Sequence, residues 1–542
     1  MYVDEELYKA FLEEMNSLEM FRMAYASLHE SKILDSEDPD IKRLIEALAF
    51  FSAKAKLAGI KNIRAARQKI FKQFFSYLMT PIPAMGILYA RTTPRLTEAT
   101  FLPKGSEIAI SSEDGKVAIF TTMAPLKILP FYLSSLDMLP LSNKGYRFLL
   151  EFYSPFPRSE ALDNISLHVN YLNNFEASLR ILSLLKRCLI QVGISFDEKV
   201  EETEHIDKCK VIFGELPKEA GESEVLNPLE KERLFFRFPW QELFLTINIP
   251  KTSSSWTKFF IYLDVNSNWP RNLILGKDIF QLFAVPVINL RRFNSEPIIC
   301  DGYKEKYLIR YPDREYGFEL HSVKGVYEVT KEGLSPLLPE VLSGSRGIFD
   351  IEETSKKDAS GVKLHYLRLD LPDAFNSPRT ITIDGLWFQP WFSTVLGHKL
   401  KVYPFTRDIS GVHWDIHPDI VPHFRNPFLD DMEACLNLIT LVHKEHLNKE
   451  DIIEILTALG IVKNNRFTRI YELIDDIRLQ TTAYGSKGTG QLKYIYWLRF
   501  SEYDSSIKPL IELFAVHLQN ILDAWIANAI VEVKIEGIDQ ET

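Results

Sequence analysis

The triplet His413, Trp414 and Asp415 is the part of this sequence most suggestive of chemistry. In a strand, His413 and Asp415 would share a face because side chains alternate. One more histidine would complete the two-histidine, one-carboxylate site of a non-haem iron oxygenase. The candidates for that position are His398, His417 and His423. The alternative interpretation is a polar turn near a domain boundary, since such triplets arise by chance and nothing else indicates a site for a co-substrate.

The glycine-rich stretch from Tyr484 to Gly490 has the G-x4-G spacing of a phosphate-binding loop. That loop also requires a lysine and a serine or threonine opening a helix. Here Gln491 and Leu492 begin a strand pattern, so no helix N-terminus would face a phosphate. We expect a hairpin or a helix-to-strand turn.

His443 and His446 are spaced i, i+3 on a predicted helix, whereas zinc proteases place two histidines at i, i+4. The adjacent aspartates at 430–431 and 475–476 lie on or beside predicted helices, where neighbouring side chains point about 100° apart. They are typical of caps and surface charges, and no G-x-S-x-G elbow occurs. We therefore predict no catalytic residue, no metal ligand and no cofactor.

Composition narrows the function classes. A chain of 542 residues is long enough for two to four domains. Its net charge of −10 argues against nucleic-acid binding. The four cysteines are far apart in the sequence, as expected for reduced thiols. An acidic N-terminus and the lack of a span of about 20 apolar residues predict a cytoplasmic protein without membrane insertion.

The elements that would position any site begin with helices. Two series recur every seven residues in the first predicted helix, with Glu14 interrupting one of them. They form a heptad-like seam of Leu7, Phe11, Leu18, Phe21, Tyr25 and Leu28. Three heptads are short for an independent coiled coil, so this helix needs a partner, either in its own domain or in another chain.

Asp38 and Pro39 are typical of a helix cap followed by a first helical residue. A second helix over Ile41–Phe51 and a third from Ile63 to Leu78 are predicted, ending before Pro81. Residues 1–46 carry twelve acids and five bases, and residues 47–97 carry nine bases and no acid. The helices would neutralise each other, or the basic stretch would face an acidic partner.

Short strand patterns fill residues 84–425, interrupted by polar stretches at 215–232 and 351–361 that resemble loops or linkers. Helical periodicity returns at 429–446, 449–459 and 466–480, followed by an alternating strand at 492–500 and a final amphipathic helix. The predicted fold is α+β and multidomain: an N-terminal helical segment (1–83), two β-rich sandwich- or barrel-like domains (84–232 and 233–425) and a C-terminal α/β domain (426–542).

Two stretches resemble the TssF family, also called VasA or ImpG. The first is a DPDIKRLIEALAFF helix at 38–51 followed by PIPAM at 81–85, and the second is FAVPVINL at 283–290 followed by EPI at 296–298. The matching positions include Asp38, Pro39, Leu44, Pro81, Pro83, Pro286, Asn289, Glu296 and Pro297. Ala284 replaces the family's usual cysteine, Lys42 replaces an acid, and Arg291-Arg292 replaces an aromatic residue. Residues 408–423 also fit poorly, which indicates a divergent member.

The resemblance implies a non-catalytic baseplate wedge subunit of a type VI secretion system, cytoplasmic at the baseplate docked on the inner membrane. Its implied partners are a second copy of itself, a TssG-like wedge subunit, a TssK-like adaptor, a TssE-like sheath initiator and a VgrG-like spike. In the family, an N-terminal helical bundle holds the wedge together, so the heptad-like seam would face other chains. The alternative within the structural class is a baseplate protein of a phage tail or other contractile device.

Overall fold

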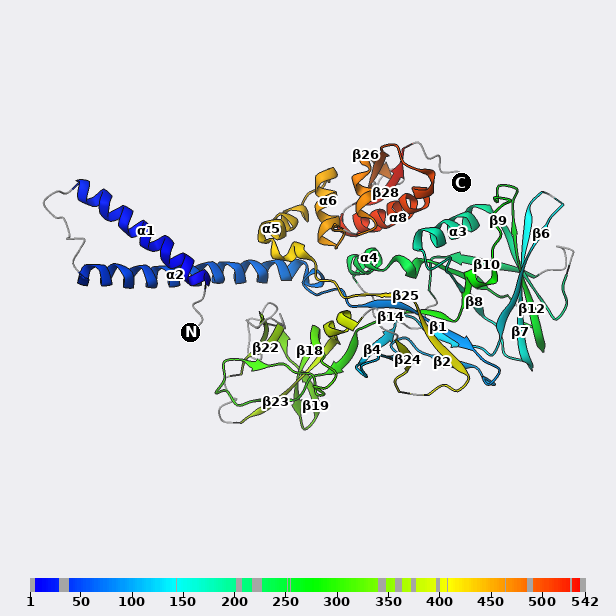
Figure 1. Cartoon of the computed structure of the whole chain (residues 1–542), viewed down its shortest axis with the longest axis horizontal. Coiled ribbons are helices and arrows are strands. Elements are labelled where there is room, and N and C mark those ends of the chain that lie inside the picture. The colour runs from blue at the N-terminus through cyan, green and yellow to red at the C-terminus, as the bar shows by residue number, and fades with distance from the viewer. Residues whose placement is uncertain are drawn as a thin grey trace. The chain divides into compact units, whose positions relative to one another are not determined.

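The computed structural model describes residues 5–28, 39–142, 144–200, 207–216, 227–250, 252–253, 255–339, 348–355, 363–371, 377–395, 400–406, 408–463, 465–484, 491–526 and 529–536. The chain forms two compact units, one of residues 1–79 and 427–445 and one of residues 80–426 and 446–542. Helices come first, strands dominate the centre, and α/β structure closes the chain (Figure 1). The predicted fold class is therefore confirmed, while the division at residues 83, 232 and 425 stays a prediction.

The first unit is helical. Its elements are α1 (Glu5–Leu28), α2 (Pro39–Phe74), the 3-10 turns η2 (Ser76–Leu78) and η9 (Pro427–Asp430), and α5 (Met432–Leu441). Pro39 begins α2 as predicted, and Asp38 lies outside the described residues. The prediction of separate second and third helices was wrong, because α2 runs through both. Residues 52–69 are rich in Ala, Lys and Arg, and a single Gly59 costs only about 1 kcal/mol, too little to end such a helix.

A six-stranded sheet lies in the second unit with strand order β24-β3-β4-β14-β1-β25. Its members are β1 (Met85–Thr92), β3 (Glu107–Ser111), β4 (Val117–Thr122), β14 (Ala284–Ile288), β24 (Lys401–Pro404) and β25 (Val412–Val421). The end strands β24 and β25 lie against each other, so this sheet curls toward a barrel. A separate ribbon pairs β2 (Thr100–Leu102) with β5 (Leu126–Ile128).

An eight-stranded sheet has the order β13-β8-β11-β10-β9-β12-β7-β6. Its strands are β6 (Tyr132–Pro140), β7 (Tyr146–Arg158), β8 (Asn164–Val169), β9 (Leu189–Phe196), β10 (Asp207–Phe213), β11 (Phe244–Asn248), β12 (Trp256–Val265) and β13 (Phe280–Leu282). Phe152 and Phe259 stack at 4.6 Å between ring centres in its core. Arg147 and Asp264 form a buried two-pronged ion pair at 2.7 and 2.9 Å.

Helices accompany this sheet. They are α3 (Phe175–Cys188), α4 (Pro228–Arg237) and the 3-10 turns η4 (Pro239–Glu242) and η5 (Lys277–Ile279). Asn227 caps α4 by accepting a hydrogen bond from the Leu229 amide. The prediction of a loop through residue 232 was therefore wrong over 228–232, because this cap and the apolar face of α4 follow directly after the polar stretch.

Two further sheets share one hydrophobic core, in which Leu367, Ile381 and Trp387 are buried. One contains β15 (Arg291–Asn294), β16 (Ile298–Cys300), β18 (Glu319–Thr330), β19 (Gly333–Pro336) and β23 (Arg379–Phe388), followed by the turn η8 (Pro390–Val395). The other contains β17 (Tyr307–Leu308), β20 (Leu338–Pro339), β21 (Ile348–Ser355) and β22 (Lys363–Asp370). The loop predicted from residue 351 is strand to Ser355, because β21 pairs along its length with β22; residues 356–361 lie outside the described chain.

The C-terminal part of the second unit contains α6 (Lys449–Ala458), α7 (Thr468–Glu472), η10 (Ser505–Ile507) and α8 (Lys508–Trp525), with a sheet of β26 (Ile474–Tyr484), β27 (Gln491–Phe500) and β28 (Ala529–Ile535). The strand at 492–500 and the amphipathic final helix are confirmed. The helix predicted at 466–480 was wrong beyond Glu472. Pairing with β27 over the whole of β26 outweighed the local helical pattern.

Candidate functional site

The His413–Asp415 triplet lies in β25, as a strand should, beside β1. The Asp415 carboxylate lies 3.4 Å from the Arg91 guanidinium, and His413 is exposed. Within the described ranges, no three His, Cys, Asp or Glu side chains converge in a way that would hold a metal ion. His398 lies outside those ranges and the side chain of His417 is not described, whereas the His423 ring packs against Phe388. An iron site therefore gains no third ligand from the geometry.

The other residues considered for chemistry lie after a helix, at a helix cap, in surface ion pairs or in a hairpin. α5 ends at Leu441, so His443 and His446 follow the helix, and the prediction that they share a helix was wrong. Asp431 caps α5 by accepting hydrogen bonds from two backbone amides. The aspartates at 475–476 lie in β26 rather than beside a helix and pair at the surface with Arg499. The glycine-rich stretch joins β26 to β27, which are antiparallel, as a hairpin requires. Residues 485–490 themselves lie outside the described chain.

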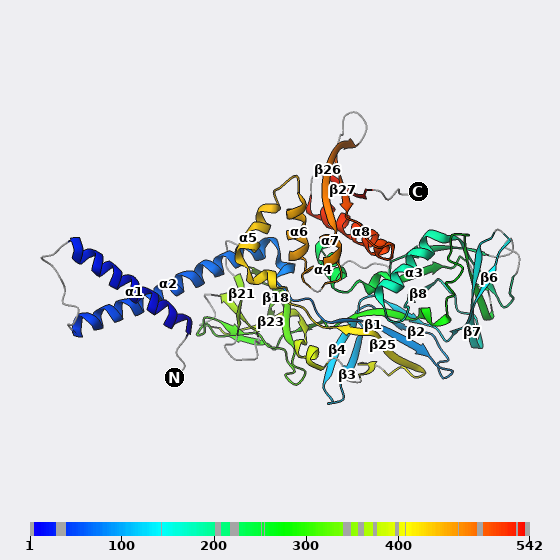
Figure 2. The same ribbon diagram turned by 45° about the horizontal axis from the view of Figure 1, so that its top comes forward.

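The strongest candidate for a functional surface is the pair α1 and α2. Figures 1 and 2 show that α1 crosses α2 instead of lying along it. The crossing is built from small residues: Ala10 is 7% exposed, and Ala49 and Ala53 are fully buried. Alanines let two helices approach closely, but they bury little apolar area. The contact therefore positions α1 while leaving many large apolar side chains of both helices exposed.

Polar groups fix the register of this crossing. The Ser52 hydroxyl donates a hydrogen bond of 2.8 Å to Glu14, and the Lys56 ammonium lies 3.1 Å from the same carboxylate and 3.5 Å from Glu13. The hydrogen bond from Ser52 is the largest cause of a lowered pKa at Glu14, and the contact with Lys56 lowers it further. The hydrogen bond to Glu14 in turn raises the pKa of Lys56. Glu14, which interrupts the heptad-like seam, thus faces a base on α2. This contact supports the expectation that the two oppositely charged stretches partly neutralise each other.

The six seam residues divide into two groups. Leu7, Phe11 and Leu18 are partly buried. The other three are exposed, at 69% for Phe21, 41% for Tyr25 and 77% for Leu28. The crossing explains the division, because the two helices separate toward Leu28 (Figure 2). Half of the seam is therefore left open to solvent in this chain.

Large apolar side chains also project from α2. Two groups with heptad-like spacing are exposed: Leu44, Leu48 and Phe51, and then Ile60, Ile63, Ile70 and Phe74. At 100° per residue, the first group lies about 150° around α2 from the side that holds Ala49 and Ala53. The second group returns to roughly that side, but α1 has 24 residues against the 36 of α2 and does not extend over it. The hairpin thus presents two separate apolar stripes.

An exposed apolar surface on this scale is characteristic of an interaction site. The core of this hairpin is small: α1 buries only one side chain, Ala10, among its described residues. Isolated helices gain most of their stability from packing an apolar face. The two helices of the hairpin therefore leave apolar faces that they do not bury against each other. None of the described helices is long and apolar enough to cross a membrane.

The motif residues of the second unit form its internal framework. The Pro81 carbonyl accepts a hydrogen bond of 2.8 Å from Nε2 of His321, and burial lowers the pKa of that histidine to about 4. Pro83 is buried, whereas Pro297 is exposed. The Glu296 amide donates to the Arg310 carbonyl at 2.9 Å. Pro81 and Glu296 thus form hydrogen bonds between segments that are separated in the sequence. The described motif residues do not line a common pocket.

Pro286 shows why proline is tolerated in a central strand. The Asn289 amide bonds the Ala84 carbonyl at 2.8 Å, and the Phe283 carbonyl accepts from the Ala90 amide at 3.1 Å. Backbone groups alternate along a strand, so odd-numbered residues of β14 face β1 and Pro286 faces the other way. Its missing N–H therefore costs no bond to β1.

Asn289 is a buried junction, 1% exposed. Its Nδ2 donates to the Ile119 carbonyl at 2.9 Å and to Oε1 of Gln389 at 3.1 Å, and its Oδ1 accepts from the Gln389 amide at 2.8 Å. Gln389 in turn donates to the carbonyls of Val117 and Tyr316. The pair thus ties β4, the end of β14 and the end of β23 together with every amide group engaged.

Sequence reasoning missed Gln389, His321 and the buried alanines of the hairpin. Gln389 and His321 lie 100 and 240 residues from their partners Asn289 and Pro81 along the chain, and no local pattern marks them. Ala49 and Ala53 did carry a signal, because two small residues at i, i+4 in a helix indicate close approach of a second helix.

The sequence matches the family "Type VI secretion system, TssF" over residues 22–151 and 230–344. The structure resembles a chain of a TssK-TssF-TssG baseplate subcomplex of the type VI secretion system, with a TM-score of 0.72 and 15% identity over 91% of this chain and 96% of that one. It also resembles a chain of a type VI baseplate complex, with a TM-score of 0.59 and 15% identity over 98% of this chain and 96% of that one. No curated protein matches the chain.

Proposed function

Because this chain belongs to the TssF family of type VI secretion systems, we propose that it is a structural baseplate subunit whose N-terminal hairpin joins it to other wedge subunits. The observation that carries the proposal is the exposed apolar surface of α1 and α2, which the described part of the chain leaves uncovered. Obligate interfaces are large and apolar, with aromatic anchors. Phe21 and Phe51, at 69% and 66% exposed, have the character of such anchors.

The two apolar stripes of α2 support a bundle with more than one additional helix. One stripe begins near Leu44, and the other continues toward Phe74 beyond the crossing. The heptad spacing of each stripe suits a partner helix lying along it. A second copy of this chain and a TssG-like subunit would supply these helices, as the family resemblance implies. The basic side chains of α2 favour partner helices with acidic flanks.

Further contacts are proposed from the family. The similar chain of the TssK-TssF-TssG subcomplex supports a TssK-like adaptor as a neighbour. A TssE-like sheath initiator and a VgrG-like spike complete the proposed surroundings, with the wedge on the cytoplasmic side of an inner-membrane-docked baseplate. In this role the chain positions other subunits and performs no chemistry of its own.

The test is the native mass of the chain co-expressed with a TssG-like protein. We expect a stable complex with two copies of this chain and one of the partner. Phe51→Glu should weaken it by at least about tenfold, since a buried aromatic anchor contributes roughly 2 kcal/mol or more to binding. Removal of residues 1–28 should abolish the complex.

The matched control is Ile274→Glu, which also places a charge on an exposed apolar position, 75% exposed, but in the second unit. It should leave the complex intact. A monomer that ignores the partner would refute the proposed assembly. Equal weakening by Phe51→Glu and Ile274→Glu would refute the hairpin as its interface.

A further inference from the structure

Strand β8 extends beyond its neighbour β13. β13 pairs only with Leu167–Val169, the second half of β8. At Phe283, with φ of 49°, the chain turns out of the sheet, and the Phe283 carbonyl accepts its hydrogen bond from Ala90 of β1 instead. A positive φ at phenylalanine is uncommon and marks a sharp change of direction. The edge of β8 over Asn164–Ser166 therefore has no paired strand on that side among the described residues.

The backbone groups at this edge point outward. The Asp163 carbonyl accepts from the Ile249 amide at 3.0 Å, and the Val169 amide donates to the Leu243 carbonyl at 2.8 Å, so odd-numbered residues face β11. The Asn170 amide bonds the Ile279 carbonyl at 2.8 Å on the opposite side. By this alternation the N–H and C=O groups of Asn164 and Ser166 face the open side.

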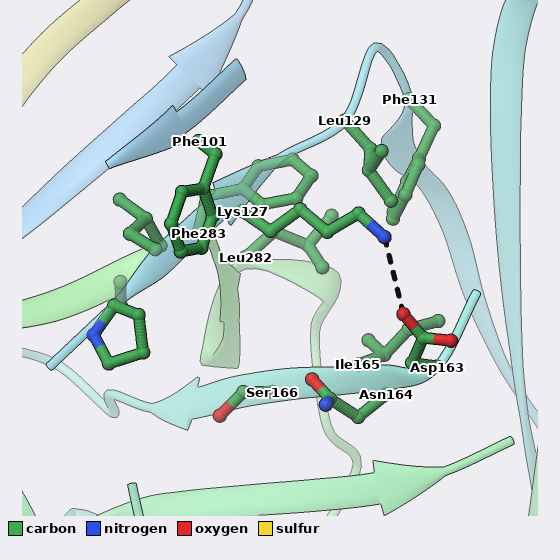
Figure 3. Close-up of a pocket in the computed structure, with 13 residues that line it drawn as sticks. Phe101, Lys127, Leu129, Phe131, Asp163, Asn164, Ile165, Ser166, Leu282 and Phe283 are labelled. Atoms are coloured by element: carbon green, nitrogen blue, oxygen red, sulfur yellow. Dashed lines mark hydrogen bonds and ion pairs between the residues drawn. The ribbon is translucent and has the colours of Figure 1, made fainter. Parts of the chain in front are cut away.

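An apolar cavity of about 320 Å³ lies against the open edge. Its walls include Phe101, Leu129, Phe131, Leu282 and Phe283, and Asn164, Ile165 and Ser166 form its floor (Figure 3). This volume lies within the range of natural ligand sites, roughly 300–1,000 Å³. The cavity therefore combines unpaired main-chain groups with apolar walls.

Lys127 of β5 reaches across the cavity, and its ammonium lies 3.4 Å from the Asp163 carboxylate (Figure 3) and 3.3 Å from the Ala161 carbonyl.

We propose that the open edge of β8 binds an extended segment of a partner protein, as an antiparallel strand in line with β13. Main-chain bonds to Asn164 and Ser166 would supply affinity, and apolar side chains of the segment would enter the cavity. The Asp163 carboxylate and the Lys127 ammonium, 72% and 43% exposed and paired with each other here, would exchange that contact for a base and an acid on the outer side of the segment. The inference does not depend on the proposed baseplate role.

Main-chain chemistry favours a peptide over a small apolar ligand. A small hydrocarbon would fill the cavity but leave the edge groups unpaired, and exposed sheet edges are templates for strand addition. The test probe is a capped hexapeptide that alternates valine with lysine, threonine and glutamate. Hydrogen exchange of the full chain should slow at least tenfold at the amides of Asn164 and Ser166 when this peptide saturates the site.

Two variants make the test specific. Ser166→Pro removes the outward N–H without removing a bond to β11, and should abolish peptide binding. Ser166→Ala removes the hydroxyl, which lies 3.1 Å from the Thr246 hydroxyl, but keeps the N–H and should bind normally. Phe101→Ser, at a 55% exposed wall position, should weaken binding about tenfold without affecting folding, and covers the case in which Ser166→Pro does not fold.

Two results would overturn the proposal. One is unchanged exchange at both amides with millimolar peptide. The other is equal affinity of the peptide for the wild type, Phe101→Ser and any folded Ser166→Pro protein, which would place the peptide elsewhere.

Discussion

Acid should destabilise the second unit through His168. This side chain is fully buried between the six-stranded and eight-stranded sheets. Its Nε2 lies 3.2 Å from the Trp240 carbonyl, which can only accept, so Nε2 carries the hydrogen. Its Nδ1 accepts from the Tyr89 hydroxyl at 2.8 Å. Accepting the hydrogen bond from Tyr89 requires an unprotonated Nδ1 and therefore a neutral ring, and burial lowers the pKa of His168 to about 4 from its ordinary 6.5.

The direction of the pH effect follows from the protons that the folded and unfolded chains bind. Between pH 6.5 and pH 4, the unfolded chain binds a proton that the native chain does not. The stabilising contribution is therefore complete above pH 6.5 and is lost as the pH falls toward 4. A shift from 6.5 to about 4 corresponds to about 3 kcal/mol when fully expressed. At pH 5 about 2 kcal/mol of this should be lost relative to pH 7.

Urea unfolding followed by tryptophan fluorescence measures this effect. All eight tryptophans lie in the second unit, so the signal reports on that unit alone. The comparison is between the wild type and His168→Gln, which keeps an N–H donor and cannot be protonated. The loss of unfolding free energy from pH 7 to pH 5 should be about 2 kcal/mol smaller in the variant. Identical losses in the two proteins would refute the reasoning.

Two substitutions test the framework of the second unit in the same assay. Asn289→Ala should lower the free energy of unfolding by about 3 kcal/mol, because it leaves several buried polar groups without partners. An unchanged urea midpoint would show that the hydrogen bonds of Asn289 do not stabilise the unit. Asp264→Ala should cost about 3–5 kcal/mol by leaving the buried Arg147 charge uncompensated, whereas Asp163→Ala, at an exposed ion pair, should change the midpoint little.

Local sequence patterns predicted the elements that local forces dominate. The start of α2 at Pro39 follows from a proline suited to the first helical turn. The strand at 492–500 and the face of α8 followed from periodicities of 2 and 3.6 residues. The heptad-like seam correctly marked α1 as a helix, and half of the seam is exposed here, while its covering by other chains stays a prediction.

Tertiary structure decided the rest. Residues 474–480 have helical periodicity, yet they form β26 because β27 lies beside them along their whole length. The buried pairs Tyr89–His168 and Asn289–Gln389 join residues 79 and 100 positions apart, and the open edge of β8 exists only because β13 turns away at Phe283. A local pattern encodes which face of an element is apolar, whereas which other segment meets that face depends on packing energy summed over the whole fold.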